Sequence, residues 1–355
     1  MNKQHKLIYL LFAFVLLIST LPFQASVVHA KSNSAIPNSN NPYVQAYMNS
    51  MEQYSSTQDM DPLVDPKVEE QIILNTLELY YELDIKVLDE LSNYYPDATT
   101  SKEVVSINRE DKVNIMSKIM KIYDSVEEVE VKELFLDYLD RYAMGPNDSE
   151  SEVITFIEEN TEKEDLVNTT ASYNGTGAGN WAYNNWNYYR RDYPKFTGDF
   201  GTDCTNFVSQ ALHIGGGKSK SGDWTVSRKN LTYWTIDSAY QLNYSWKLTD
   251  PSPWISVKEF RSYWRPKSGV SSYSADYYRQ NHEQIYSGDI YKGDVLVFHK
   301  GIANFVTVPT HLMIISAYDS SNKDFLLAGH TNNRQAYPLL SAISSYSQIE
   351  ILKIN

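Results

Sequence analysis

Residues 203–212 read DCTNFVSQAL, and this segment carries the only cysteine of the 355-residue chain, Cys204. Its apolar positions recur at three-to-four spacing and share one helical face with the cysteine: Phe207, Val208, Ala211 and Leu212. This pattern predicts a helix with one buried face. Asp203 is a residue type that favours the N-cap, and the three glycines at 215–217 favour a stop. The segment therefore predicts a buried helix that begins close to Cys204.

A thiol in the first turn of a helix lies beside unpaired N–H groups and the positive end of the helix dipole, which favour a thiolate. A thiolate is the form that attacks a carbonyl. The alternative is a buried structural cysteine, which behaves as a small hydrophobe. A single cysteine excludes a disulfide scaffold and any Cys-clustered zinc or iron–sulfur site. We therefore predict that Cys204 is a nucleophile.

A nucleophilic cysteine needs a base, and the histidines that follow it are the candidates. His311 opens a predicted strand over residues 311–318, from which it can reach a helix tip. His330 ends the next predicted strand, and a turn over residues 319–323 joins the two strands into a hairpin. His330 can then lie beside His311 and orient its ring, and Asn332 is the rival for that role. The other histidines are weaker candidates: His213, His282 and His299.

The composition changes near residue 171. All seven Trp lie between Trp181 and Trp264, and the predicted strands come later. These strands cover residues 294–299, 311–318, 325–330 and 348–354. Helices first and strands later predict an α+β domain over residues 171–355.

Several motifs of this domain, in this order, resemble the bacterial putative amidase domain family, which is related to the papain-like NlpC and CHAP cell-wall cysteine hydrolases. The motifs are Tyr173-Asn174 with the aromatic run to Pro194, DCTNFVSQ at 203–210 followed by Gly215-Gly216, GDV at 293–295, THLMII at 310–315, and GHTN at 329–332. The resemblance covers residues 171–355.

The resemblance implies a papain-like α+β fold, in which the cysteine helix packs on a small antiparallel sheet. By the family pattern Cys204 is the nucleophile, His311 is the general base and acid, and His330 orients the ring. Asp203 is then structural, near the start of the helix. No cofactor is implied, and the histidines lack the paired spacing of metal ligands.

The resemblance also raises two local questions. The oxyanion donors are expected to be the backbone N–H of Cys204 and one upstream side chain. Papain-like enzymes have a glutamine six residues before the cysteine, where this chain has Gly198, so Tyr193 is a replacement candidate. Glycines at 175, 177 and 179 favour a late start, near Asn180, for the helix that precedes the cysteine.

The charge divides the chain into two unlike halves. Residues 31–170 hold 11 Lys+Arg against 30 Asp+Glu, a charge of −19, whereas residues 171–355 carry +4. The total of −13 argues against a nucleic-acid partner. We expect a flexible spacer over residues 31–65, an acidic helical region over 66–146 and a linker over 147–170. The acidic half is either a solvated helical spacer or an inhibitory unit that contacts the catalytic domain.

Residues 1–30 are typical of a signal peptide. Lys3 and Lys6 precede an apolar run over residues 7–21, and Val28-His29-Ala30 is a candidate cleavage site with small residues. The alternative is a membrane anchor, but the run is shorter than the ~20 residues of a spanning helix. We expect no transmembrane helix in the mature chain, and a protein that is secreted or associated with the cell wall.

These features predict an exported cysteine amidase or peptidase that cleaves an amide or peptide bond, with peptidoglycan or a peptide as its substrate. The aromatic residues and the basic charge of the domain suit an anionic wall polymer. Two alternatives stay open: a papain-like acyltransferase, and an inactive module that binds the wall or a partner.

Overall fold

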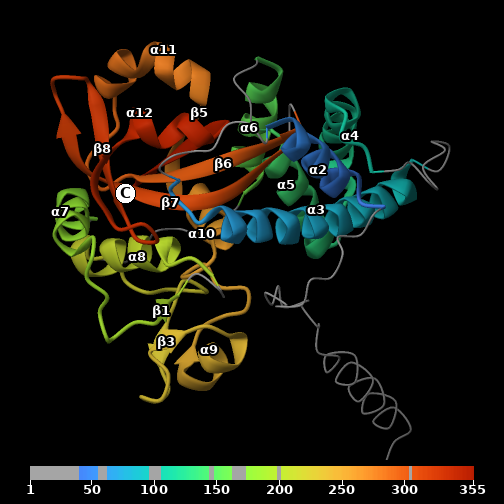
Figure 1. The fold of residues 1–355 in the computed structure, drawn as a ribbon. Coiled ribbons are helices and arrows are strands. Elements are labelled where there is room, and N and C mark those ends of the chain that lie inside the picture. The colour runs from blue at the N-terminus through green and yellow to red at the C-terminus, as the bar shows by residue number, and fades with distance from the viewer. Residues whose placement is uncertain are drawn as a thin grey trace, which may run out of the picture.

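The computed structural model describes residues 40–54, 62–95, 105–143, 148–161, 173–197, 201–303 and 306–355 (Figure 1). The expected signal peptide, residues 1–30, lies outside the described residues. The described chain forms an N-terminal half of helices, residues 40–161, and a C-terminal half of helices and sheet, residues 173–355. This mixture agrees with the predicted α+β class.

A six-stranded sheet forms the centre of the C-terminal half, and all its neighbouring strands run antiparallel. Its strands, in spatial order, are β5 (Ser268–Ser274), β10 (Gln348–Ile354), β6 (Val295–Ala303), β7 (Val306–Asp319), β8 (Asp324–Gly329) and β9 (Arg334–Pro338). The four strands predicted from the sequence are the four central ones. The two edge strands were not predicted, because SGVSSYS and RQAYP show no apolar alternation.

Helices cover both faces of this sheet (Figure 1). One face packs against α7 (Gly175–Asn185), α8 (Cys204–Gln210) and α10 (Val257–Trp264). The other face packs against α11 (Ala275–Tyr286) and α12 (Leu339–Ala342). Strand β7 alternates between the two cores: Leu312 and Ile314 face α8, whereas Met313 and Ile315 face the opposite side.

Two short strand pairs and one helix complete the C-terminal half. Strand β1 (Lys195–Phe196) pairs in parallel with β3 (Thr235–Ile236), and β2 (Ser227–Arg228) pairs with β4 (Trp246–Lys247). Helix α9 (Ala239–Ser245) lies beside them. Strand β1 precedes α8 in the chain and the other elements follow it, and all of them lie on the α8 side of the sheet (Figure 1).

Helix α7 begins at Gly175, not near Asn180 as expected. Its glycines are contact points between backbones, which explains why the helix tolerates them. A Cβ atom at Gly177 would lie 2.4 Å from the carbonyl oxygen of Gly215, and one at Gly179 would lie 2.6 Å from that of Ile315. The glycines therefore allow α7 to pack closely on the end of the cysteine helix and on β7.

The N-terminal half consists of α2 (Pro42–Tyr54), α3 (Pro66–Tyr94), α4 (Arg109–Ile122), α5 (Val129–Tyr142) and α6 (Asp148–Asn160). Two of these helices differ from the sequence expectation. Helix α2 lies in the expected spacer, and its Tyr43 and Val44 are buried against α3 and its neighbours. Helix α6 lies in the expected linker, and its Val153 and Ile157 are buried. In each segment a short apolar face packs against the neighbouring helices.

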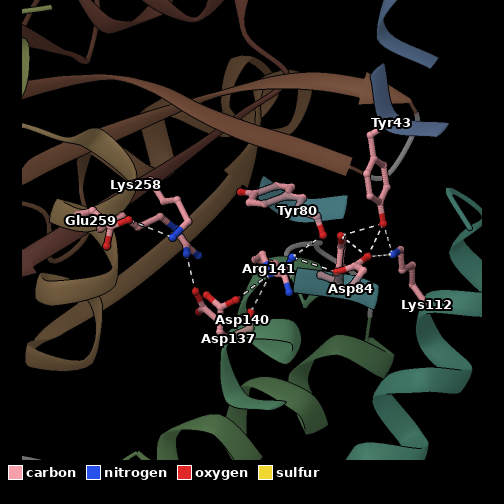
Figure 2. A network of polar contacts seen from close by, with 11 residues as sticks. Tyr43, Tyr80, Asp84, Lys112, Asp137, Asp140, Arg141, Lys258 and Glu259 are labelled. Atoms are coloured by element: carbon pink, nitrogen blue, oxygen red, sulfur yellow. Dashed lines mark hydrogen bonds and ion pairs between the residues drawn. The ribbon is translucent and has the colours of Figure 1, made fainter. Parts of the chain in front are cut away.

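A buried charge cluster joins four of these helices (Figure 2). Asp84 on α3 is 1% exposed, and Lys112 on α4 forms an ion pair with its Oδ2 atom. The guanidinium of Arg141 lies 2.9 Å from the Oδ1 atom. The hydroxyl groups of Tyr43 and Tyr142 donate hydrogen bonds to Oδ2. Burial lowers the pKa of Lys112 to about 8, which shows how strongly this cluster is removed from water.

The two halves pack against each other. Ile302, Val306 and Val308, at the tip of the β6–β7 hairpin, belong to the core of the N-terminal half. Asp140 on α5 pairs with Arg261 and lies 2.6 Å from Arg265, both of the C-terminal half. The acidic half is therefore a docked unit, held by apolar contacts and by buried charges.

Candidate active site

Cys204 is the first residue of α8 and is fully buried, with 0% of its surface exposed. Asp203 occupies the N-cap position as predicted, but its carboxylate does not cap the helix. Instead its Oδ1 atom accepts hydrogen bonds from the backbone N–H of Phe196 and from the side chain of Asn206. The carboxylate therefore ties the first turn of α8 to its surroundings.

Three polar groups surround the sulfur of Cys204. The Thr202 hydroxyl lies 3.2 Å from it and the Thr205 hydroxyl 3.8 Å. The backbone of Leu312, on β7, also forms a hydrogen bond with the thiol. Burial raises the pKa of the thiol, the three hydrogen bonds lower it in part, and the charge of Asp203 raises it. The expectation that the helix end favours a thiolate is therefore not met in this closed site, because desolvation is the larger effect.

His311 lies on β7 directly before Leu312, the residue whose backbone contacts the sulfur. It pairs across the strands with Phe298, and the two rings lie 6.0 Å apart. Phe298 packs in the core that contains Met313, so the ring of His311 lies on the face of β7 opposite to Leu312 and α8, and no hydrogen bond joins it to Cys204 among the described residues. The ring is 1% exposed, and its Nδ1 atom has no hydrogen-bond partner among the described residues. Burial lowers the pKa of His311 to about 3, so the imidazole is neutral at neutral pH and is a weak base while the site is closed to water.

His330 follows β8, and it does not orient the ring of His311 as predicted. Its Nδ1 atom lies 2.6 Å from the carboxylate of Asp203, and its Nε2 atom lies 3.3 Å from the carbonyl oxygen of Asn185. The reason is register: Ile314 pairs with Ala328, which places position 330 level with Leu312, on the face that packs against α8.

Aromatic rings enclose the bonded pair of Asp203 and His330. The ring of His330 lies 4.1 Å from that of Phe207 and 4.2 Å from that of Tyr189. Phe207 lies one helical turn after Cys204. The pair of Asp203 and His330 therefore contacts the helical turn that carries the thiol and fixes its position. His330 is thus placed as a positioning residue for α8.

The alternative site residues lie elsewhere. The side chain of Asn332 donates a hydrogen bond to the carbonyl oxygen of Pro62. Tyr193, the candidate oxyanion donor, stacks on Trp254 with the rings 5.7 Å apart and lies in the apolar core. His299 lies 3.4 Å from Glu350. Position 198, which the papain-like resemblance compares with a glutamine, lies outside the described residues.

Sequence reasoning missed Thr202, Glu69 and Tyr346. The signal for Thr202 was its place two residues before the cysteine, and its hydroxyl is the polar group nearest to the sulfur in the hydrogen bonds described above. Glu69 carried no local signal. It accepts a hydrogen bond from Thr310, which lies 241 residues away in the chain and directly before His311.

The described residues contain no group of three metal-ligating side chains. In the same part of the chain, no helix has the length and apolar character needed to cross a membrane.

Comparison with known proteins identifies the family. The family model described as "Putative amidase domain" matches residues 172–353, which is more than half of the chain. The chain belongs to this family. A search of curated proteins and a search of solved structures each found no match. The amidase domain supports a hydrolase that acts on amide bonds, and its match spans both Cys204 and His311.

Proposed function

We propose that the protein is a cysteine amidase or peptidase, with Cys204 as nucleophile and His311 as general base and acid. One observation carries the proposal: the backbone of Leu312 bonds to the thiol, and the residue before Leu312 on β7, His311, is a buried neutral histidine whose Nδ1 atom lacks a described partner. The match to an amidase family supplies the reaction class.

In the proposed reaction, His311 takes the proton of the Cys204 thiol as the sulfur attacks the amide carbonyl. A sulfur–carbon bond forms, the carbon–nitrogen bond breaks, and His311 gives its proton to the leaving amine. Water then attacks the thioester and loses a proton to His311, which returns the proton to the thiol as the carboxylic acid leaves. The backbone N–H of Cys204 and the Thr202 hydroxyl are the proposed oxyanion donors.

Peptidoglycan or another peptide is the proposed substrate, because the sequence predicts export. The papain-like relationship is part of the same proposal. It rests on the order of the cysteine and histidine motifs and on the packing of α8 against an antiparallel sheet.

The test is hydrolysis by the purified full chain on purified peptidoglycan and on peptide amides, with products identified by mass spectrometry. Cys204→Ala should abolish release of the amine, and His311→Ala should lower the rate by about a hundredfold or more. His282→Ala, on α11, is the matched control and should keep the wild-type rate. Undiminished hydrolysis by Cys204→Ala would overturn the proposal, and transfer of the acyl group to an added amine in place of water would favour the acyltransferase.

A further inference from the structure

Three residues of the C-terminal half hold a carboxylate that belongs to the N-terminal half. Glu69, in the first turn of α3, accepts a hydrogen bond of 2.9 Å from the Thr310 hydroxyl. The Nζ atom of Lys300 lies 3.2 Å from the other oxygen of the same carboxylate. The Tyr346 hydroxyl is hydrogen-bonded to Glu69 as well. Thr310 is 0% exposed and Tyr346 is 6% exposed, so the carboxylate is held at a buried site.

This carboxylate site adjoins the reacting groups. Thr310 directly precedes His311, and the ring of Tyr346 lies 5.0 Å from that of Phe298, the cross-strand partner of His311. Burial raises the pKa of Tyr346, and both Glu69 and the Cys204 thiol raise it further. The Tyr346 phenol therefore interacts electrostatically with both the Glu69 carboxylate and the Cys204 thiol.

The segment that delivers Glu69 also contacts the chain that follows His330. The Pro62 carbonyl oxygen accepts a hydrogen bond from Asn332, two residues after His330. The next two residues, Leu63 and Val64, are 4% and 1% exposed and pack in the core that contains Met313. Residues 62–69 thus run from Asn332, which follows β8, to Thr310 on β7.

In this closed form no substrate can reach the thiol. Cys204, His311 and His330 are 0%, 1% and 2% exposed. Residues 62–69 contact Thr310, which precedes His311, and Asn332, which follows His330, so an opening of the site at this end would take the carboxylate of Glu69 away from Lys300, Thr310 and Tyr346. A partly buried cation and two buried hydroxyl groups would then lack an anionic partner, which is an unfavourable arrangement unless another carboxylate replaces the first.

We propose that Lys300, Thr310 and Tyr346 form a binding site for a carboxylate of the substrate, and that Glu69 fills this site while the enzyme is closed. The inference rests on the proposed function, because the substrate is the amide that Cys204 attacks. The substrate class is a peptide or amide with a free carboxylate close to the scissile bond. Glu69 acts as its tethered competitor.

Alkylation of Cys204 by iodoacetamide tests the site without any need for hydrolysis. Glu69→Ala in the full chain should raise the alkylation rate by about tenfold, because the closed form loses its charged contact. Glu70→Ala is the matched control, with the same change one residue along α3, and should keep the wild-type rate. In the Glu69→Ala protein, N-acetylglutamate should slow alkylation and N-acetylglutamine should not. Equal alkylation of Glu69→Ala and wild type, or equal effects of the two ligands, would overturn the proposal.

Two further variants separate a lost fold from a lost site. Glu69→Gln keeps the acceptor for Thr310 and removes the charge, and it should also raise the alkylation rate while keeping the wild-type circular dichroism. Adding Lys300→Met to Glu69→Ala should remove the protection by N-acetylglutamate, and protection that survives would overturn the assignment of Lys300.

Hydrolysis separates this inference from the proposed function. If Cys204-dependent hydrolysis proceeds equally with carboxylate and amidated substrates, the carboxylate site is wrong and the amidase function stands. If N-acetylglutamate protects Cys204 but no amide is cleaved, the carboxylate site stands and the amidase function is wrong.

Discussion

The two halves of the molecule each bury a polar cluster, and the clusters differ in how their charges are paired. In the N-terminal half, each oxygen of Asp84 has a cation beside it, Lys112 on one and Arg141 on the other (Figure 2). In the C-terminal half, the Cys204 thiol has only uncharged hydrogen-bond partners in the contacts described, and Nδ1 of His311 has no partner within the described chain. Paired charges specify a structure, whereas unpaired polar groups weaken it. The first cluster is therefore structural, whereas the second fits the proposed chemistry of Cys204 and His311.

Breaking the paired cluster should have the largest effect on stability. Asp84→Ala leaves Lys112 and Arg141 buried without their shared anion, and we expect the free energy of unfolding to fall by about 3–5 kcal/mol. Urea unfolding followed by circular dichroism measures the change. Asp89→Ala removes an exposed acid from the same helix and serves as the control. A decrease in the free energy of unfolding of less than about 1 kcal/mol for Asp84→Ala would show that the cluster does not stabilise the fold in this way.

The unpaired histidine should make the wild-type protein sensitive to acid. The pKa of His311 is about 3 in the folded chain, against an ordinary value of 6.5, so the unfolded chain binds the additional proton as the pH falls below 6.5. Stability therefore decreases with falling pH, and His311 accounts for about 2 kcal/mol between pH 7 and pH 5.

His311→Leu should remove this part of the pH dependence of unfolding, and His282→Leu should leave it in place. The measurement is urea unfolding of all three proteins at pH 5 and pH 7. If wild type and His311→Leu lose the same free energy between these pH values, His311 is not buried in its neutral form.

The smallest expected effect concerns the hydroxyl nearest to the sulfur. Thr202→Val removes a hydrogen bond that lowers the pKa of the Cys204 thiol. A hydrogen bond of about 0.5–1.5 kcal/mol corresponds to a fall of about two- to tenfold in alkylation rate at pH 7. Thr205→Val, whose hydroxyl lies 3.8 Å from the sulfur, should have a weaker effect. An unchanged rate for Thr202→Val would remove Thr202 from the site.

The sequence predicted what depends on local pattern. The start of the cysteine helix, the four central strands and the β7–β8 hairpin follow from apolar spacing and from turn residues. The partners of the histidines depend on register. A shift of one position in the pairing of β7 with β8 would move a side chain to the other face of the sheet. In the observed register position 330 lies level with Leu312, so His330 bonds to Asp203 and does not orient His311.

The contact of Glu69 with Thr310 could not be predicted from the sequence, for a different reason. It joins two residues separated by 241 positions, and it depends on how the halves dock. The helices α2 and α6 were missed because their apolar faces are short and gain stability from tertiary packing.

The most direct test of the central claim is the intact mass of the protein during turnover of a peptide amide, quenched in acid. The proposed mechanism predicts a transient acyl adduct that maps to the peptide containing Cys204, is released by hydroxylamine, and is absent from Cys204→Ala. Amide hydrolysis by the Cys204→Ala protein, or an adduct that maps to another residue, would contradict the assignment of Cys204 as the nucleophile.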